Sequence, residues 1–299
     1  MIEYLYLGRV GYNEGLSLQA EMAALRLQGR VENVLLLLEH PPVLTLGRNA
    51  NRANILASDE LLASRGVTLH EINRGGDVTY HGPGQLVGYP IFDLRSLRNP
   101  KGGRLGPVDF VRLMEEALIR ICGVFGVLAG RICGLTGVWC GALPAGGNPS
   151  GKSCAKSEPL AGRKIGAIGI HVSRGITSHG FAFNVTTDLR DFALINPCGI
   201  TDRPVTSLKN EILALAGSQP PAEPKEALPG LEAVAHQAAR QFGLVFGERV
   251  LAVESLDALR AQAEATPENP PSFPAQDTPL QVPPEVERLL QTKERPVRA

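Results

Sequence analysis

The segment Lys164–Val185, KIGAIGIHVSRGITSHGFAFNV, gives the clearest indication of the fold. Residues 164–173 alternate well enough to predict a strand with small residues on one face. After the turn at residues 173–175, residues 178–185 predict an antiparallel partner. Small side chains on a strand leave space for another group to lie against it. The segment therefore predicts a pair of antiparallel strands beside a binding surface.

Strand and helix patterns also occur elsewhere in the chain. Further strands are expected at residues 33–38, 43–46, 67–72 and 136–141. The clearest helix is expected at residues 107–126, where apolar residues recur near a 3.6-residue period after Pro107. Other helices are expected at residues 58–65, 206–216 and 229–242. Strands in hairpins with a few separated helices favour an α+β fold over strict βαβ repetition.

The composition is that of an ordinary globular protein. Hydrophobic residues make up 43% of the 299 positions, and 30 basic residues balance 30 acidic ones. This balance indicates neither a nucleic-acid partner nor an anionic membrane surface. The N-terminus lacks the pattern of a signal peptide and no apolar run is long enough to span a bilayer, so a cytoplasmic protein is expected. The spacing of the five cysteines predicts neither a disulfide framework nor a zinc site.

Two stretches depart from the globular pattern. Residues 142–163 are mostly small, polar and turn-forming, which predicts a long loop. Residues 262–299 are rich in proline and poor in large apolar side chains, so they would bury too little surface to offset the entropy of ordering. A flexible tail is expected there, apart from a short helix at about residues 284–291.

A glycine-rich loop, RGGDVTYHGPGQ at residues 74–85, combines glycines with Arg, Thr, His and Gln side chains. Glycine lets the backbone approach a ligand closely and exposes N–H donors. The chemistry favours a substrate-binding loop, and a tight surface turn is the alternative.

Cys198 lies in a turn between Pro197 and Gly199, an unusual setting for a structural thiol. A thiol is largely protonated at neutral pH, so a nucleophilic cysteine needs a neighbouring cation or base. Residue chemistry leaves Lys164, His81 and His179 as candidates for that partner, and it leaves a buried inert thiol as the alternative for Cys198.

Five motifs in order resemble the lipoyl(octanoyl) transferase family of the biotin/lipoate protein ligase superfamily. They are EHPPVLTLGR (39–48), RGGDVTYHGPGQ (74–85), GRKIGAIGI (162–170), SHGFAFNV (178–185) and NPCGI (196–200). The resemblance covers about residues 4–245. It implies an α+β fold with a mixed β-sheet flanked by helices, like the catalytic domain of biotin and lipoate protein ligases. The implied catalytic domain is 1–246 with an insertion at about 142–162, followed by a flexible Pro-rich extension at 247–299.

The resemblance also implies the reaction. An octanoyl group would pass from octanoyl-acyl carrier protein to Cys198, and then to a lysine of a lipoyl domain, as in 2-oxoacid dehydrogenase complexes and the glycine cleavage H protein. Lys164 would activate the thiol, and neither a metal nor another cofactor is expected. The implied substrate-binding residues are Arg74, Gly75, Gly76, Asp77, Val78, Thr79, Tyr80, His81, Ala167, Ile168, Gly169, Gly180, Phe181 and Ala182.

Two other functions remain possible at this point. Residues 146–153, GGNPSGKS, fit a phosphate-binding loop pattern, which suggests an ATP-using lipoate ligase. Pro159 and Gly162 leave no room for the helix that such a loop requires, so this reading is disfavoured. The non-enzymatic alternative is a module that binds an acylated carrier without turning it over.

Overall fold

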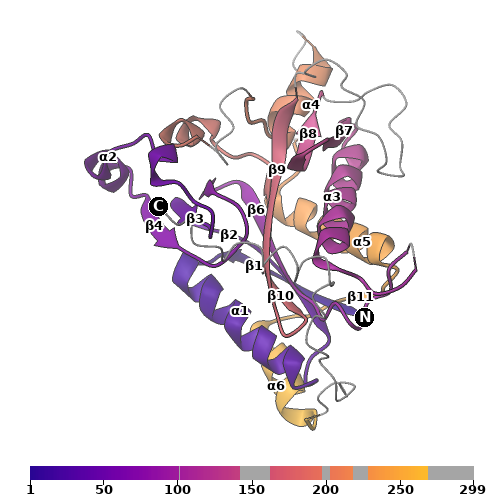
Figure 1. Cartoon of the computed structure of the whole chain (residues 1–299). Helices are drawn as coiled ribbons and strands as arrows, with labels where there is room; N and C mark the ends of the chain where they lie inside the picture. The colour runs from indigo at the N-terminus through magenta and orange to yellow at the C-terminus, as the bar shows by residue number, and fades with distance from the viewer. Residues whose placement is uncertain (101, 142–161, 197–202, 218–227, 269–299) are drawn as a thin grey trace, which may run out of the picture. The chain divides into compact units, whose positions relative to one another are not determined.

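An eight-stranded mixed sheet forms the centre of the computed structural model, which describes residues 1–100, 102–141, 162–196, 203–217 and 228–268. The strand order is β11-β1-β2-β6-β10-β9-β8-β7 (Figure 1). β1 is parallel to β2 and β11, and the other neighbours are antiparallel. The strands are β1 (Ile2–Arg9), β2 (Asn33–Glu39), β6 (Gln85–Ile91), β7 (Ala129–Ile132), β8 (Leu135–Cys140), β9 (Arg163–Ser173), β10 (Ile176–Asn184) and β11 (Val250–Ala252).

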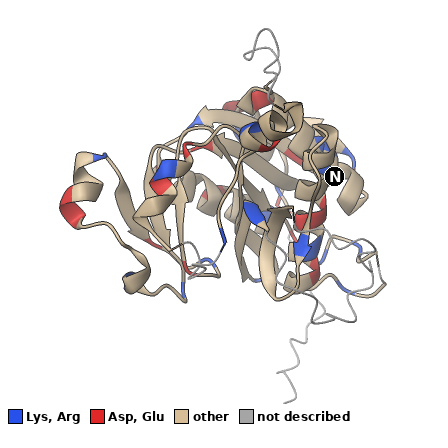
Figure 2. Ribbon diagram, turned by 90° about the horizontal axis from the view of Figure 1, so that it is seen from above, with Lys and Arg blue, Asp and Glu red and all other residues tan. Residues whose placement is uncertain are grey.

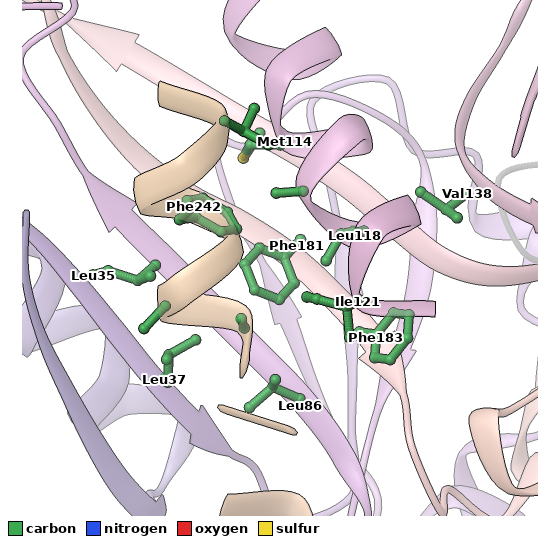
Figure 3. Close-up of a cluster of buried hydrophobic side chains, with 14 of the residues drawn as sticks. Leu35, Leu37, Leu86, Met114, Leu118, Ile121, Val138, Phe181, Phe183 and Phe242 are labelled. Carbon is green, nitrogen blue, oxygen red and sulfur yellow. The ribbon is translucent and has the colours of Figure 1, made fainter. Parts of the chain in front are cut away.

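Helices cover both faces of this sheet. The first face packs against α3 (Pro107–Val124) and α5 (Leu231–Phe246), and the second against α1 (Tyr12–Leu27) and α6 (Leu256–Ala265). The consecutive leucines of β2 alternate between the two faces: Leu35 and Leu37 point to the first face, and Leu36 and Leu38 point to the second. Figure 3 shows Leu35 and Leu37 near Phe242 of α5. A strand that is covered on both faces buries all of its side chains, so it requires an unbroken apolar run. Full burial of each such side chain contributes about 1.5–3 kcal/mol.

A second, smaller sheet has the order β4-β3-β5, with strands β3 (Val43–Leu46), β4 (Thr68–Glu71) and β5 (Val78–His81). One of its faces forms a separate apolar cluster with α2 (Asp59–Ser64) and the 3-10 helix η2 (Leu189–Leu194). A second 3-10 helix, η1 (Arg52–Asn54), lies between β3 and α2 in the chain. The main sheet with its helices confirms the predicted mixed α+β architecture.

The predicted hairpin at 164–185 is confirmed as β9 and β10, whose pairing sets Ala167 opposite Ala182 and Gly169 opposite Gly180. The expected strands at 33–38, 43–46, 67–72 and 136–141 correspond to β2, β3, β4 and β8, and the expected helices to α2, α3, α4 (Leu208–Ala216) and α5. The sequence reading missed β1, α1, β5, β6, β7, β11 and α6, and β5 lies inside the stretch that was predicted to be a glycine-rich loop. The buried side of α1 includes Gly15 and Gln19, so its apolar periodicity is weak.

The structure differs from the expected end of the folded domain at residue 246. β11 pairs with β1 at Ile2 to Tyr4, and α6 buries Leu259 and Ala263 against the second face of the sheet. The described residues after 246 therefore belong to the same compact unit. Residues 142–161 of the insertion predicted at about 142–162, and the predicted helix at about 284–291, lie outside the described residues. Within the described part of the chain, no helix is both long and apolar enough to cross a membrane.

Candidate active site

Lys164 stands near the start of β9 and is 8% exposed. Its backbone N–H donates to the Pro204 carbonyl at 2.9 Å, and its carbonyl accepts from the Thr206 N–H at 2.8 Å. Residues 203–206 therefore run parallel to β9, with Val205 beside Lys164. The chain segment that follows Cys198 in sequence returns to the main sheet at Lys164. Cys198 itself lies outside the described residues.

A small cavity adjoins Lys164 between the two sheets. Ala167 and Ala182 contribute the small side chains that the sequence predicted for this surface. The lining residues are Thr79, Gln85, Lys164, Ile165, Gly166, Ala167, Ala182, Asn184, Phe192 and Val205. The predicted site residues Lys164, Thr79, Ala167 and Ala182 thus come together at one cavity. Charged residues of both signs are interspersed over the ribbon in Figure 2.

The Arg74 side chain joins the glycine-rich loop to β3. Its guanidinium donates to the Thr45 carbonyl at 2.9 Å and to the Asp77 carbonyl at 2.7 Å. The Gly75 N–H donates to the Ile170 carbonyl of β9 at 2.9 Å. A Cβ at Gly169 would lie 2.6 Å from the Gly75 oxygen. These contacts dock the loop on β9, so Arg74, Gly75 and Gly169 have a structural use that does not depend on a ligand.

Asp77 links the loop to the chain just before Cys198. Its carboxylate accepts from the Asn51 N–H at 2.9 Å and from the Asn54 side-chain amide. The Asn54 carbonyl in turn accepts from the Asn196 N–H at 2.7 Å. Because Asn196 precedes Cys198 by two residues in the sequence, Asp77 helps to fix the start of the cysteine segment.

The alternation of β5 and β10 divides the remaining predicted substrate-binding residues between two environments. Val78 and Tyr80 point into the apolar cluster of the small sheet, and the Tyr80 hydroxyl donates to Asp191 at 2.8 Å. Phe181 belongs to the main core, where it stacks on Phe242 with ring centroids 5.5 Å apart (Figure 3). Ile168, opposite Phe181, packs against the same core. These four side chains do not line the cavity, because side chains alternate across a strand.

Gly76 and Gly180 have backbone roles. Gly76 has a φ of +94°, a conformation that favours glycine. A Cβ at Gly180 would overlap the carbonyl oxygen of Gly88 on β6. Neither glycine lines the cavity.

His81 and His179 are neutral at pH 7. Burial lowers the pKa of His81 to about 3, with His40 adding to the effect, and burial with Arg74 lowers the pKa of His179 to about 4. Desolvation disfavours the charged imidazole, so neither ring supplies the cation that a thiolate needs. Of the three partners that residue chemistry left open, Lys164 is the one that lines the cavity.

A buried hydrogen-bond chain, which sequence reasoning missed, connects the cavity to α4. His81 Nδ1 lies 2.7 Å from Gln85 Oε1, and the Gln85 amide donates to Asn184 Oδ1 at 2.9 Å. Asn184 donates to the Thr206 carbonyl at 2.9 Å, and the Thr206 hydroxyl donates to Glu211 at 2.6 Å. Gln85 and Asn184 both belong to motifs quoted in the sequence analysis, and this was the sequence feature that could have indicated their involvement. Within the described residues, no three His, Cys, Asp or Glu side chains are arranged to hold a metal ion.

The fold is similar to that of lipoate protein ligases of known structure. A crystal structure of lipoate-protein ligase A bound with ATP matches with a TM-score of 0.58 at 16% identity, covering 88% of this chain and 93% of that one. A bi-partite lipoate protein ligase from Thermoplasma acidophilum, studied with its E2 lipoyl domain, matches with a TM-score of 0.54 at 17% identity, over 88% and 91% of the two chains. The predicted likeness to the lipoate ligase fold is confirmed.

Sequence comparison then gives the family. The model of the lipoyl protein ligase A/B catalytic domain matches residues 11–220. An octanoyltransferase from Acidobacterium capsulatum is 57% identical over 85% of this chain and 94% of its own length. An octanoyltransferase from Koribacter versatilis is 50% identical over 91% and 94%. The chain belongs to the lipoyl protein ligase A/B catalytic domain family, and the predicted acyltransferase class is confirmed.

Proposed function

We propose that this chain transfers an octanoyl group from octanoyl-acyl carrier protein to a lysine of a lipoyl domain through a thioester on Cys198. Relatives named octanoyltransferases, 50–57% identical over most of the chain, support the octanoyl group. The observation that carries the proposal is the position of Lys164, buried in a cavity floored by the small residues of β9 and β10. The acceptors would be lipoyl domains of 2-oxoacid dehydrogenase complexes and the glycine cleavage H protein.

In the first step the Lys164 ammonium stabilises the Cys198 thiolate, which attacks the thioester carbonyl of the donor. The tetrahedral intermediate collapses, the carrier thiolate leaves, and Lys164 gives it a proton. The products are an octanoyl thioester on Cys198, a carrier thiol and a neutral lysine.

In the second step the amine of the lipoyl-domain lysine attacks the new thioester. Neutral Lys164 accepts the proton that the amine loses, and the Cys198 thiolate is released. The bonds balance without ATP, because the donor is already a thioester and amide formation drives the exchange. The aliphatic chain would lie along Ala167 and Ala182, and each buried CH₂ would contribute about 0.8 kcal/mol.

The test is intact-protein mass spectrometry after mixing the chain with octanoyl-acyl carrier protein in the absence of ATP. The wild type should gain the mass of one octanoyl group, and the group should move to an added lipoyl domain. Cys198→Ala should gain nothing, whereas Cys122→Ala, which removes a buried free thiol of α3, should be acylated normally.

Acylation that persists in Cys198→Ala would refute the covalent mechanism. A strict need for ATP would instead favour a ligase, and stable binding of the acylated carrier without amide formation would favour the non-enzymatic module.

A further inference from the structure

Trp139, the sole tryptophan of the chain, lies beneath the Lys164 ammonium. It stands on β8 directly opposite Lys164 and is fully buried. The Lys164 Nζ lies 5.1 Å from the centroid of the indole ring. The Arg203 guanidinium carbon lies 5.9 Å from the same centroid. Both distances are within the range of about 6 Å at which a cation is attracted to an aromatic face.

The backbone of β8 also holds the stem of Lys164. Gly137 has a φ of +124°, and a Cβ there would lie 2.9 Å from Lys164 Cε. The Gly137 N–H donates at 3.0 Å to Glu115, whose buried carboxylate is also bound by Arg112 and Arg131. β8 thus presents a glycine to the aliphatic part of Lys164 and an indole face to its charged end.

The indole N–H does not explain why a tryptophan stands here. Trp139 Nε1 is buried and has no hydrogen-bond partner among the described residues. An unmade hydrogen bond costs about 1–3 kcal/mol, a cost that a phenylalanine ring would avoid. The feature that distinguishes tryptophan is its aromatic face, which is the best of the three aromatic side chains for binding a cation.

Charged groups also stand on several other elements. Glu211 of α4 is bound by Arg163, Glu115 of α3 is bound by two arginines, and Asp191 of η2 is bound by Arg65 and Tyr80. His81 of β5 is neutral at pH 7 because it is buried. Arg203 shares the indole ring with Lys164.

We propose that Trp139 is a positioning residue for Lys164: its indole face holds the lysine ammonium charged beside the cavity and so sets the pH at which Cys198 becomes nucleophilic. The inference rests on the proposed function, because it acts through the Lys164–Cys198 pair. It extends that function to a residue of the neighbouring strand.

The experiment measures the rate at which iodoacetamide alkylates Cys198 as a function of pH, with the modified peptide quantified by mass spectrometry. The variants are Trp139→Leu, which removes the ring, Trp139→Phe, which keeps a weaker aromatic face, and Lys164→Ala. Phe110→Leu is the control, because Phe110 is equally buried but packs on α3 against Phe92 and Phe246. Without the ring the Lys164 ammonium loses its attraction to the aromatic face and is held less firmly beside the cavity, so it stabilises the thiolate less.

The alkylation midpoint should therefore rise by about half to one pH unit in Trp139→Leu. The rise should be smaller in Trp139→Phe, larger in Lys164→Ala, and absent in Phe110→Leu.

The possible failures are distinguishable. An unchanged profile in Lys164→Ala would overturn the proposed function, whereas a shift in Lys164→Ala with none in Trp139→Leu would overturn only the role of Trp139. If Trp139→Leu does not fold, Trp139→Phe and the fluorescence of native Trp139 decide the question. The tryptophan emission of the wild type should change through a pH transition that Lys164→Met lacks, and identical curves would overturn the inference.

Discussion

Gly137 allows the backbone of β8 to come against the side chain of Lys164. A Cβ at this position would lie 2.6 Å from the Gly166 oxygen and 2.9 Å from Lys164 Cε. A φ of +124° is also strained for any residue other than glycine. The absence of a side chain at Gly137 therefore allows β8 to approach β9 at this point and leaves room for the Lys164 side chain.

We predict that Gly137→Ala lowers the free energy of unfolding by about 1–3 kcal/mol and also slows acylation of Cys198. Gly134→Ala is the matched control, since Gly134 has a φ of +78° but nothing within 4 Å of an added Cβ. Urea denaturation and the acylation rate should show stability loss in both variants and rate loss in Gly137→Ala alone. Equal rates in the two variants would contradict a role for Gly137 in placing Lys164.

Three buried histidines make folding sensitive to acid. Burial lowers the pKa of His40 to about 4 from its ordinary value of 6.5, and His179 and His81 are lowered to about 4 and about 3. His40 Nδ1 lies 2.7 Å from the Val10 carbonyl and Nε2 lies 2.7 Å from the Tyr89 hydroxyl, an arrangement that a neutral imidazole satisfies. Between pH 6.5 and 4 the unfolded chain binds protons at these positions and the folded chain does not.

The free energy of unfolding should therefore keep the full contribution of these histidines above pH 6.5 and should fall as the pH drops toward 4. Each histidine should contribute up to about 1.4 kcal/mol per pH unit to this slope. Urea midpoints at a series of pH values measure this slope. His40→Gln should lower stability at pH 7 and make the slope shallower by the contribution of one proton. A slope unchanged by the substitution would show that His40 is already charged in the folded protein.

At the scale of elements, the pairing of β6 with β10 depends on one glycine in each strand, Gly88 and Gly180. A Cβ at Gly180 would overlap the Gly88 carbonyl oxygen, and a Cβ at Gly88 would overlap the Phe181 ring. The sequence reading assigned Gly180 to substrate binding. The structure provides a packing reason for it, because β6 and Phe181 occupy the space that a side chain would need.

Gly180→Ala should destabilise the protein by at least about 1–3 kcal/mol, the usual cost of overpacking a core. Gly123→Ala in α3 is the comparison, because an added Cβ there meets nothing within 4 Å and alanine favours a helix by up to about 1 kcal/mol. Thermal or urea unfolding should show opposite signs for the two variants. A Gly180→Ala protein of wild-type stability that fails only to bind substrate would restore the sequence-based interpretation.

At the scale of the whole molecule, the start and end of the folded unit support each other. β11 and β1 pair although they stand almost at opposite ends of the unit, and the Ile2 N–H donates to the Arg249 carbonyl at 2.8 Å. Gln262 of α6 donates to the buried Glu3 at 2.7 Å. The partly exposed Arg260–Glu21 ion pair adds little to stability, so the packing of Leu259 and Ala263 is the larger contribution.

A chain shortened after Phe246 should be less stable than one shortened after Asn269 by at least about 3 kcal/mol, because it loses β11 and the apolar cover of α6. Urea denaturation of the two shortened chains and the full chain makes the comparison. Equal stability would support the domain end that the sequence suggested at residue 246.

The sequence by itself determined the elements whose patterns are local. The alternation of 164–185, the apolar run of β2 and the period of α3 each stand within one segment, and each predicted element was found. The ordered motifs likewise gave the family, because their residues and order are written in the chain. The nucleophile assigned to Cys198 stays a prediction from the sequence.

Only the tertiary structure decided which residues from distant parts of the sequence are in contact. It assigned Arg74 and Asp77 to docking the glycine loop, directed Tyr80 and Phe181 into apolar clusters, joined β11 to β1, and set Trp139 under Lys164. It also buried His81 and His179, which lowers the pKa of both rings. These features are burial, strand pairing and the cation–π contact. They arise between segments far apart in the chain, and no local pattern encodes them.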